Sequence, residues 1–180
     1  MEKGKDSGTN PTKNSTTVER TSDRELVVTR TFNGPAHVVF DAWTKPELLK
    51  RWWAPKSFGI AFLSCEADVR TGGKYRFVFS HPSAPEGMAF FGRYLEVNPP
   101  TRLVWTNEEG EGPGAVTTVT FEEKAGETLV VMHDLYPSKQ ALDDAIASGS
   151  TGAPAEQFEE LEQLLVALEA SVAPLASGKQ

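Results

Sequence analysis

The sequence has little cysteine and no long apolar run. Its one cysteine, Cys65, has no internal partner for a disulfide bond, and the three histidines lack the spacing of metal ligands. No stretch reaches 18 consecutive apolar residues, which excludes a membrane-spanning helix of ordinary length. The first residues, MEKGKDSGTN, lack the apolar segment of a secretory signal. We therefore expect a cytoplasmic protein that holds no metal and no cofactor.

Positive charge is also scarce. The 180 residues carry a formal net charge of -7, with 18 Lys and Arg against 25 Asp and Glu. Seven of the acids lie between Gln140 and Gly178, where there is no Lys or Arg. This balance argues against nucleic acid as a partner. The acidic segment is either a solvated helix face or an electrostatic contact for a protein partner.

The chain divides into one domain and two tails. Residues 1–22 consist largely of Lys, Ser, Thr, Asn and Gly with almost no apolar side chains, which predicts a disordered N-terminal tail. Residues 23–173 contain the apolar runs and turn signals of one folded domain. Residues 174–180 are predicted to form a flexible C-terminal tail. The sequence does not indicate the oligomeric state.

Strand and helix patterns follow one another in an order that defines the fold class. ELVVTRTF predicts a strand, and Pro35 followed by apolar residues at helical spacing predicts a helix. Six further strand-like runs are separated by Gly- and Pro-rich turns, which predicts an antiparallel meander. Phe158, Leu161, Leu165 and Leu168 form the apolar stripe of a long C-terminal helix. The prediction is an α+β fold in which a curved antiparallel sheet of about six or seven strands wraps around this helix.

Aromatic side chains gather on one face of the predicted sheet. Tyr75, Phe77 and Phe79 alternate with polar residues and therefore share a face. The runs 88–97 and 128–135 are apolar on both parities, so alternation does not identify their inward face. Large aromatic rings between a sheet and a helix either fill the interior or line a cavity for an apolar ligand. The sequence leaves both interpretations open.

Four blocks of sequence add a family resemblance that covers about residues 24–170. They are RTFNGPAHVVFDAWTKPELLKRWWAP, DVRTGGKYRFVF, FFGRYLEVNPPTRLVWT and VTFEEKAGETLVVMHD. In this order they resemble the family of activator of heat-shock-protein-90 ATPase homologues, within the START-like, SRPBCC superfamily. The resemblance implies the helix-grip fold, a curved sheet around a long C-terminal helix. It also implies a cavity for lipids, sterols or other hydrophobic small molecules.

The candidate ligand-binding residues follow from the aromatic face and the helix stripe. They are Trp53, Tyr75, Phe77, Phe79, Phe91, Trp105, His133, Phe158 and Leu161. His133 is either a core histidine with a satisfied hydrogen bond or a group that orients a ligand or acts as a base. Cys65 is interpreted as a small packed side chain rather than a nucleophile, and no catalytic residue is assigned.

Three functions remain compatible with these patterns. The first is binding of a hydrophobic small molecule or lipid between the sheet and the C-terminal helix. The second is a co-chaperone role, in which the domain binds a heat-shock chaperone ATPase, as the family resemblance implies. The third is a cyclase- or hydrolase-like enzyme that uses the same cavity.

Overall fold

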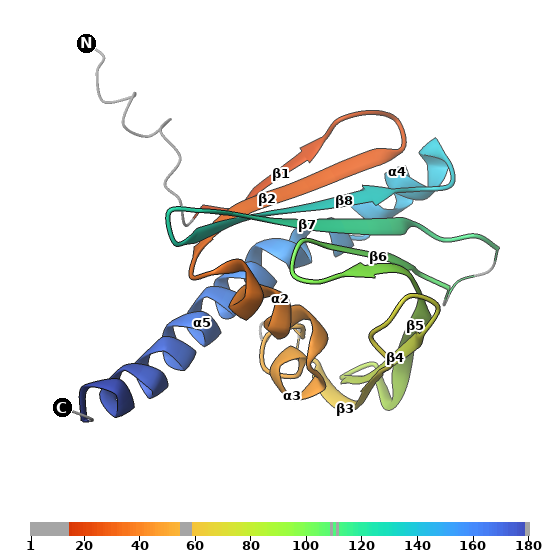
Figure 1. Cartoon of the computed structure of the whole chain (residues 1–180). Coiled ribbons are helices and arrows are strands. Elements are labelled where there is room, and N and C mark those ends of the chain that lie inside the picture. Colours follow the sequence, from red (N-terminus) through yellow and green to blue (C-terminus); the bar gives the residue numbers. More distant parts are fainter. Residues whose placement is uncertain (1–14, 55–58, 109, 111, 179–180) are drawn as a thin grey trace, which may run out of the picture.

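The structure, a computed structural model, describes residues 15–54, 59–108, 110 and 112–178 (Figure 1). The strands in this part of the chain are β1 (Thr17–Arg20), β2 (Glu25–Asn33), β3 (Ala61–Ala67), β4 (Lys74–His81), β5 (Ala84–Asn98), β6 (Arg102–Thr106), β7 (Val116–Lys124) and β8 (Glu127–Leu135). The helices are α2 (Ala36–Thr44), α3 (Pro46–Leu49), α4 (Lys139–Ala147), the short 3-10 helix η2 (Ser150–Gly152) and α5 (Ala153–Gly178).

All eight strands join one antiparallel sheet. Their order is β1-β2-β8-β7-β6-β5-β4-β3, so β3 to β8 form the predicted meander. The first long strand, β2, pairs with the last strand, β8, over its whole length. Figure 1 shows the sheet curving around α2, α3 and the first half of α5. The predicted α+β helix-grip arrangement is confirmed.

The strand that the sequence analysis missed is β1. Its four residues are all exposed, and they pair with β2 between Thr17 and Arg20. The predicted disordered tail, residues 1–22, therefore includes a strand. Residues 1–14 of this tail lie outside the described part of the chain. A short polar edge strand pairs through its backbone and so carries no hydrophobic pattern. The Arg20 side chain adds an ion pair with Asp143 at 2.8 Å. At the other end, α5 continues through Gly178, past the predicted boundary at 174.

The turn between β2 and α2 has the chemistry that the sequence indicates. Gly34 has a φ of 135°, in the region that favours glycine, and Pro35 follows at the N-cap position. The backbone N–H of Ala36 donates to the Glu123 carboxylate at 2.9 Å, which satisfies one of the donors at the start of α2. This turn fixes α2 against the sheet.

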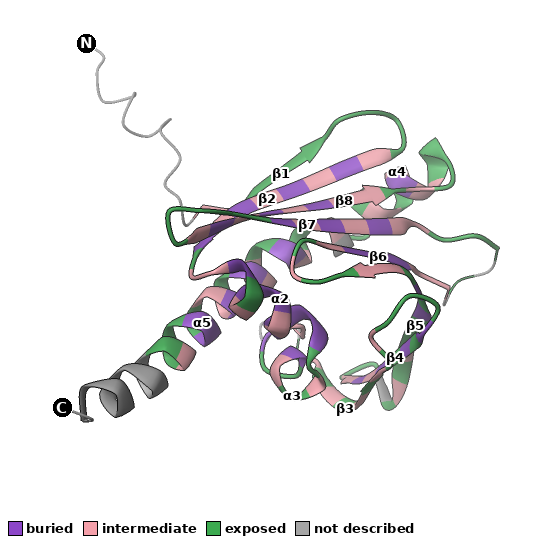
Figure 2. Ribbon diagram, in the orientation of Figure 1, coloured by how far each residue is buried: buried purple, intermediate pink, exposed green. Residues whose placement is uncertain are grey.

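Side chains alternate between the two faces of the sheet (Figure 2). Tyr75, Phe77 and Phe79 are buried on the inner face, as their spacing predicts. Phe158 on α5 meets Phe32 on β2 edge to face, with ring centroids 5.5 Å apart. Because Phe32 is fully buried, this contact places α5 on the inner face of the sheet.

A buried arginine fastens α5 to β2. The Arg30 side chain is 1% exposed, with Nη1 3.1 Å from Glu159 Oε2 and Nη2 3.7 Å from Glu162 Oε1. Nη1 also donates to Thr16 Oγ1 at 3.0 Å, and the guanidinium lies 5.4 Å from the centre of the Phe32 ring. Burial raises the pKa of Glu162, and the charge of Arg30 opposes that rise. The ion pair therefore links α5 directly to β2.

Candidate functional site

Trp43 on α2 is the centre of an aromatic cluster that fills most of the interior. It is 3% exposed. Ring centroids within 6.1 Å of its own belong to Trp52, Trp53, Trp105, Phe121 and Phe158. Most of the rings thus pack against one another, which is the first of the two interpretations that the sequence left open.

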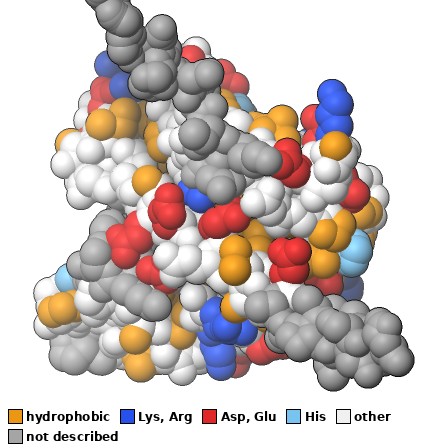
Figure 3. Space-filling view, turned by 90° about the vertical axis from the view of Figure 1, so that its left-hand side faces the viewer, with side chains coloured by type: hydrophobic (Ala, Val, Ile, Leu, Met, Phe, Trp, Pro, Cys, Tyr) orange, Lys and Arg blue, Asp and Glu red, His pale blue; other side chains and the backbone are white. Residues whose placement is uncertain are grey.

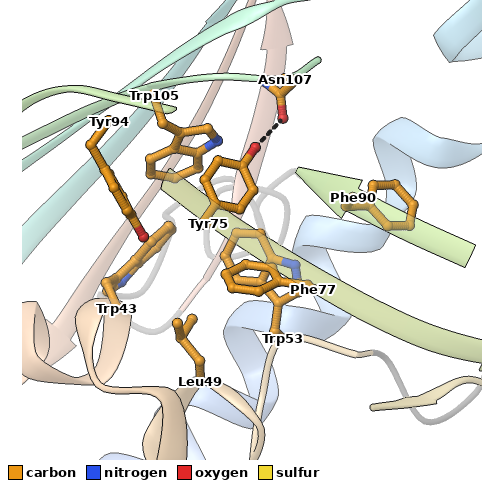
Figure 4. A pocket seen from close by; sticks show the side chains of 9 residues that line it. All are labelled: Trp43, Leu49, Trp53, Tyr75, Phe77, Phe90, Tyr94, Trp105 and Asn107. Carbon is orange, nitrogen blue, oxygen red and sulfur yellow. Dashed lines mark hydrogen bonds between the residues drawn. The ribbon is translucent and has the colours of Figure 1, made fainter. Parts of the chain in front are cut away.

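A cavity of about 50 Å³ remains beside this cluster (Figure 4). Its lining consists of Trp43, Leu49, Trp53, Tyr75, Phe77, Phe90, Tyr94, Trp105 and Asn107. Ligand pockets typically measure roughly 300–1,000 Å³. The cavity therefore accommodates only one end of a ligand unless side chains move.

A larger groove of about 690 Å³ adjoins the cavity. Trp53 and Phe90 line both hollows, so the cavity and the groove are neighbours at these rings. The groove is formed mainly by apolar side chains of the β4–β5 hairpin and by the start of α5. Gln157 on α5 donates a side-chain hydrogen bond to the carbonyl of Trp53, which fixes the helix against the segment after α3. Together, cavity and groove have the volume that a small ligand needs.

The polar groups of the cavity are Tyr75 and Asn107. The Tyr75 hydroxyl donates to the Thr106 carbonyl at 2.7 Å, and its oxygen lies 3.5 Å from Asn107 Oδ1 (Figure 4). Because a hydroxyl has one proton, the 2.7 Å bond to the carbonyl engages it. Asn107 Oδ1 thus receives at most a weak hydrogen bond from this neighbour.

A hydrogen-bonded chain leads from Asn107 along the inner face of the sheet. Asn107 Nδ2 donates to the Ala115 carbonyl at 2.8 Å and to Thr117 Oγ1 at 3.1 Å. The Thr117 hydroxyl donates in turn to Asp134 Oδ1 at 2.6 Å. Burial raises the pKa of Asp134, and the hydrogen bond from Thr117 partly offsets this rise. These hydrogen bonds hold the side chain of Asn107 in one orientation.

Four of the predicted ligand-binding residues line the cavity: Trp53, Tyr75, Phe77 and Trp105. Phe79 lines the groove instead. Phe158 and Leu161 are 1% and 0% exposed and belong to the packed core beneath the cavity. The structure therefore brings most of the predicted residues together, but it assigns the two helix residues to support rather than to the lining.

Two predicted residues, Phe91 and His133, lie on the opposite face of the sheet, so their expected inward orientation is wrong. Phe91 pairs across the strands with Arg76, whose side chain points outward, whereas its neighbour Phe90 pairs with the buried Phe77. His133 directly follows the inward-facing Met132 on β8, so its side chain points to the outer face. There its Nε2 lies 2.9 Å from Glu25 Oε2. Both residues belong to runs that are apolar on both parities, where alternation gives no direction.

The sequence analysis did not select Trp43, Leu49, Phe90, Tyr94 or Asn107. Asn107 was identifiable, because it continues the parity of Leu103 and Trp105 beyond the end of β6. Phe90 was not, since the residues on both sides of it are apolar. Trp43 required knowledge of how α2 packs against the sheet.

The nucleophilic side chains near the site are not activated. Burial raises the pKa of the Cys65 thiol to about 11, and burial also raises the pKa of the Tyr94 hydroxyl. Within the described ranges, no group of three or more His, Cys, Asp or Glu is placed to hold a metal ion. No helix in the described chain is long and apolar enough to cross a membrane.

A curved antiparallel sheet that grips a long C-terminal helix, with an aromatic cavity between them, defines a helix-grip α+β protein. The sequence profile of the family described as "Activator of Hsp90 ATPase homolog 1-like protein" matches residues 33–166. The chain therefore belongs to this family.

Solved bacterial structures share the fold. A protein from Rhodobacter sphaeroides is 24% identical with a TM-score of 0.77, and the match covers 86% of this chain and 99% of that one. A Staphylococcus epidermidis protein is 28% identical with a TM-score of 0.67, covering 83% and 93%. An AHSA1-like protein from Aeromonas hydrophila is 20% identical with a TM-score of 0.61, covering 76% and 92%. No curated protein matches the chain.

Proposed function

We propose that the protein binds a hydrophobic small molecule, such as a lipid-like or aromatic compound, in the groove beside the start of α5. One end of the ligand enters the cavity, and the rest lies on Trp53, Phe79 and Phe90. The observation that carries this proposal is that Trp53 and Phe90 line both the cavity and the groove. Their combined volume lies within the range of ligand sites, although the cavity alone does not.

The exposure of apolar side chains along the groove supports the proposal. Met88 is 39% exposed and Phe90 is 37% exposed, on the inner side of the β4–β5 hairpin. Exposed apolar groups beside a pocket lose contact with water when an apolar ligand binds, at roughly 25 cal/mol per Å². A ligand of this kind thus gains affinity from the groove and position from the cavity.

Fluorescence titration with the neutral dye N-phenyl-1-naphthylamine tests this function. We expect saturable binding, loss of at least about tenfold in affinity for Phe90→Asp, and little change for Phe91→Asp. These two residues are adjacent and equally exposed, at 37% each, but they face opposite sides of the sheet. No dye binding, or equal effects of the two substitutions, would rule out the groove as a ligand site. His133→Ala on the outer face serves as a second control.

A co-chaperone role is the second candidate. The family description names an activator of a chaperone ATPase, and the interior is largely packed. The helix α5 carries no Lys or Arg, and Glu156, Glu160 and Glu169 lie on it besides the two Glu that pair with Arg30, which suits contact with a basic surface. Figure 3 shows acidic side chains spread over the middle of one face of the molecule. Unchanged ATPase turnover of the purified heat-shock chaperone on addition of the protein would remove this candidate.

An enzymatic role has less support than binding. The residue proposed as acid or base, His133, lies on the outer face and contacts Glu25 rather than the cavity. Among the described residues, the cavity lining contains Tyr75 and Tyr94 but no His, Asp, Glu, Cys or Lys, whereas the groove lining includes His81. Without a group of suitable pKa at the cavity, acid–base chemistry there has no evident donor or acceptor of protons near neutral pH.

A further inference from the structure

Two aromatic side chains border both hollows of the proposed site. Trp53, which follows α3, and Phe90, which lies on β5, line the cavity as well as the groove. A side chain that borders both hollows stands where one faces the other. Whether a ligand in the groove can reach the cavity therefore depends on these two rings.

The ring of Trp53 is held firmly. Its centroid lies within 6.2 Å of the ring centroids of Trp43, Trp52, Phe77 and Trp105. The side chain packs against the buried core, and the carbonyl of Trp53 accepts a hydrogen bond from Gln157. Because a shift of this ring would disturb close packing on several sides, Trp53 forms the fixed side of the boundary.

The ring of Phe90 is held much less firmly. It is 37% exposed, and within the described part of the chain its ring contact is with Phe79, at 5.4 Å between centroids. Figure 4 shows Phe90 at the rim of the lining, apart from the rings gathered around Trp53. Exposed side chains change rotamer within picoseconds to nanoseconds. Phe90 is therefore the movable side of the boundary.

The cavity as it stands is too small for an aromatic ring. Its volume is about 50 Å³, whereas an apolar cavity that binds benzene measures roughly 150 Å³. An unbranched alkyl end is narrower than a ring and needs less space beside Phe90. A phenyl end needs the space that the ring of Phe90 itself occupies.

From the position, exposure and weak packing of this ring we propose that Phe90 determines the specificity of the site, which selects ligands with an unbranched alkyl end over ligands that end in an aromatic ring. The inference rests on the proposed binding function. A ring-ended ligand binds only those molecules in which Phe90 has turned away, and its apparent affinity falls by that fraction. Truncation of Phe90 to alanine removes this penalty and leaves a space with the shape of a phenyl ring.

Binding of two neutral probes to the full chain tests this selectivity. The probes, 1-octanol and 5-phenyl-1-pentanol, are alcohols of similar length that differ at the apolar end, and calorimetry at pH 7 measures their binding. We expect the wild-type protein to bind 1-octanol about fivefold more tightly than the phenyl alcohol. In Phe90→Ala, this ratio should fall by at least about tenfold, so that the phenyl alcohol binds as tightly or more tightly.

The matched control is Phe91→Ala. Phe91 is adjacent to Phe90 and equally exposed, at 37%, but it lies on the opposite face of the sheet. Its truncation should therefore leave the ratio between the two alcohols unchanged.

The outcomes separate this inference from the proposed function. A ratio that changes by less than about twofold in Phe90→Ala, including an equal loss of affinity for both alcohols, shows that Phe90 is only contact surface and overturns the inference. Tighter binding of the phenyl alcohol to the wild-type protein also overturns it; in both cases the groove remains a ligand site. Failure of both alcohols and of N-phenyl-1-naphthylamine to bind rejects the proposed function itself. If Phe90→Ala does not fold by circular dichroism, Phe90→Leu replaces it with the same expected direction, and if neither folds, the ranking on the wild-type protein decides.

Discussion

Replacing the buried guanidinium by an apolar side chain, Arg30→Met, tests how α5 is held on the sheet. Glu159 is 61% exposed, so its separation from Arg30 has little effect, as for other exposed ion pairs. The side chain of Glu162 is only 12% exposed and would remain buried without its cation. Removing one partner of a fully buried pair costs roughly 3–5 kcal/mol. Since Glu162 retains some solvent contact, we expect a loss of about 2–3 kcal/mol at pH 7.

The pH dependence of this loss identifies its cause. Burial already raises the pKa of Glu162 above its ordinary value, and removing Arg30 raises it further. The folded variant then binds a proton more tightly than the unfolded chain, so the loss is present at neutral pH and shrinks as the pH falls through the raised pKa. Urea unfolding of Arg30→Met and Arg30→Met/Glu162→Gln between pH 4 and 8 measures it. The double variant should recover most of the stability at pH 7. A loss under about 1 kcal/mol, or one that does not vary with pH, would refute the role assigned to Glu162.

Three further expectations follow from other parts of the molecule. Burial raises the pKa of Asp134, so Asp134→Asn should be more stable than wild type at pH 8, with the difference vanishing below about pH 4 in thermal unfolding. A Cβ on Gly92 would overlap the Thr106 carbonyl, so Gly92→Ala should cost about 3 kcal/mol in urea unfolding, whereas Gly152→Ala, with open space around it, should change stability by under about 0.5 kcal/mol. With a pKa of about 11, the Cys65 thiol should react with 5,5′-dithiobis(2-nitrobenzoate) at pH 8 roughly a hundredfold more slowly than free cysteine; an ordinary rate would contradict its burial.

The fold could be predicted from the sequence because its patterns agree with one another. The alternation in β4 correctly predicted that Tyr75 and Phe77 face the interior. The apolar stripe around Phe158 correctly predicted that one side of the last helix packs against the sheet. β1 was missed because it is a short, exposed strand whose pairing with β2 is made by backbone groups, which leaves no trace in side-chain type. The buried position of Arg30 was unpredictable from parity alone, since arginine is rarely buried without a partner from elsewhere in the chain.

The candidate site was less predictable than the fold. Its position depends on which of two adjacent apolar residues, Phe90 or Phe91, faces inward, and register decides this rather than composition. The size of the cavity depends on the packing of Trp43 among rings from several elements. Such packing distances have no counterpart in a linear pattern.

The first turns of α5 divide two tasks between neighbouring positions. Ala153 and Gln157 border the groove, while Phe158 and Leu161, on the next part of the helix, are enclosed by the core. Substitutions at the first pair can therefore reshape the opening while the second pair keeps the helix anchored. Proteins with this fold can therefore differ in the ligand that they bind without a large change in the stability of the domain.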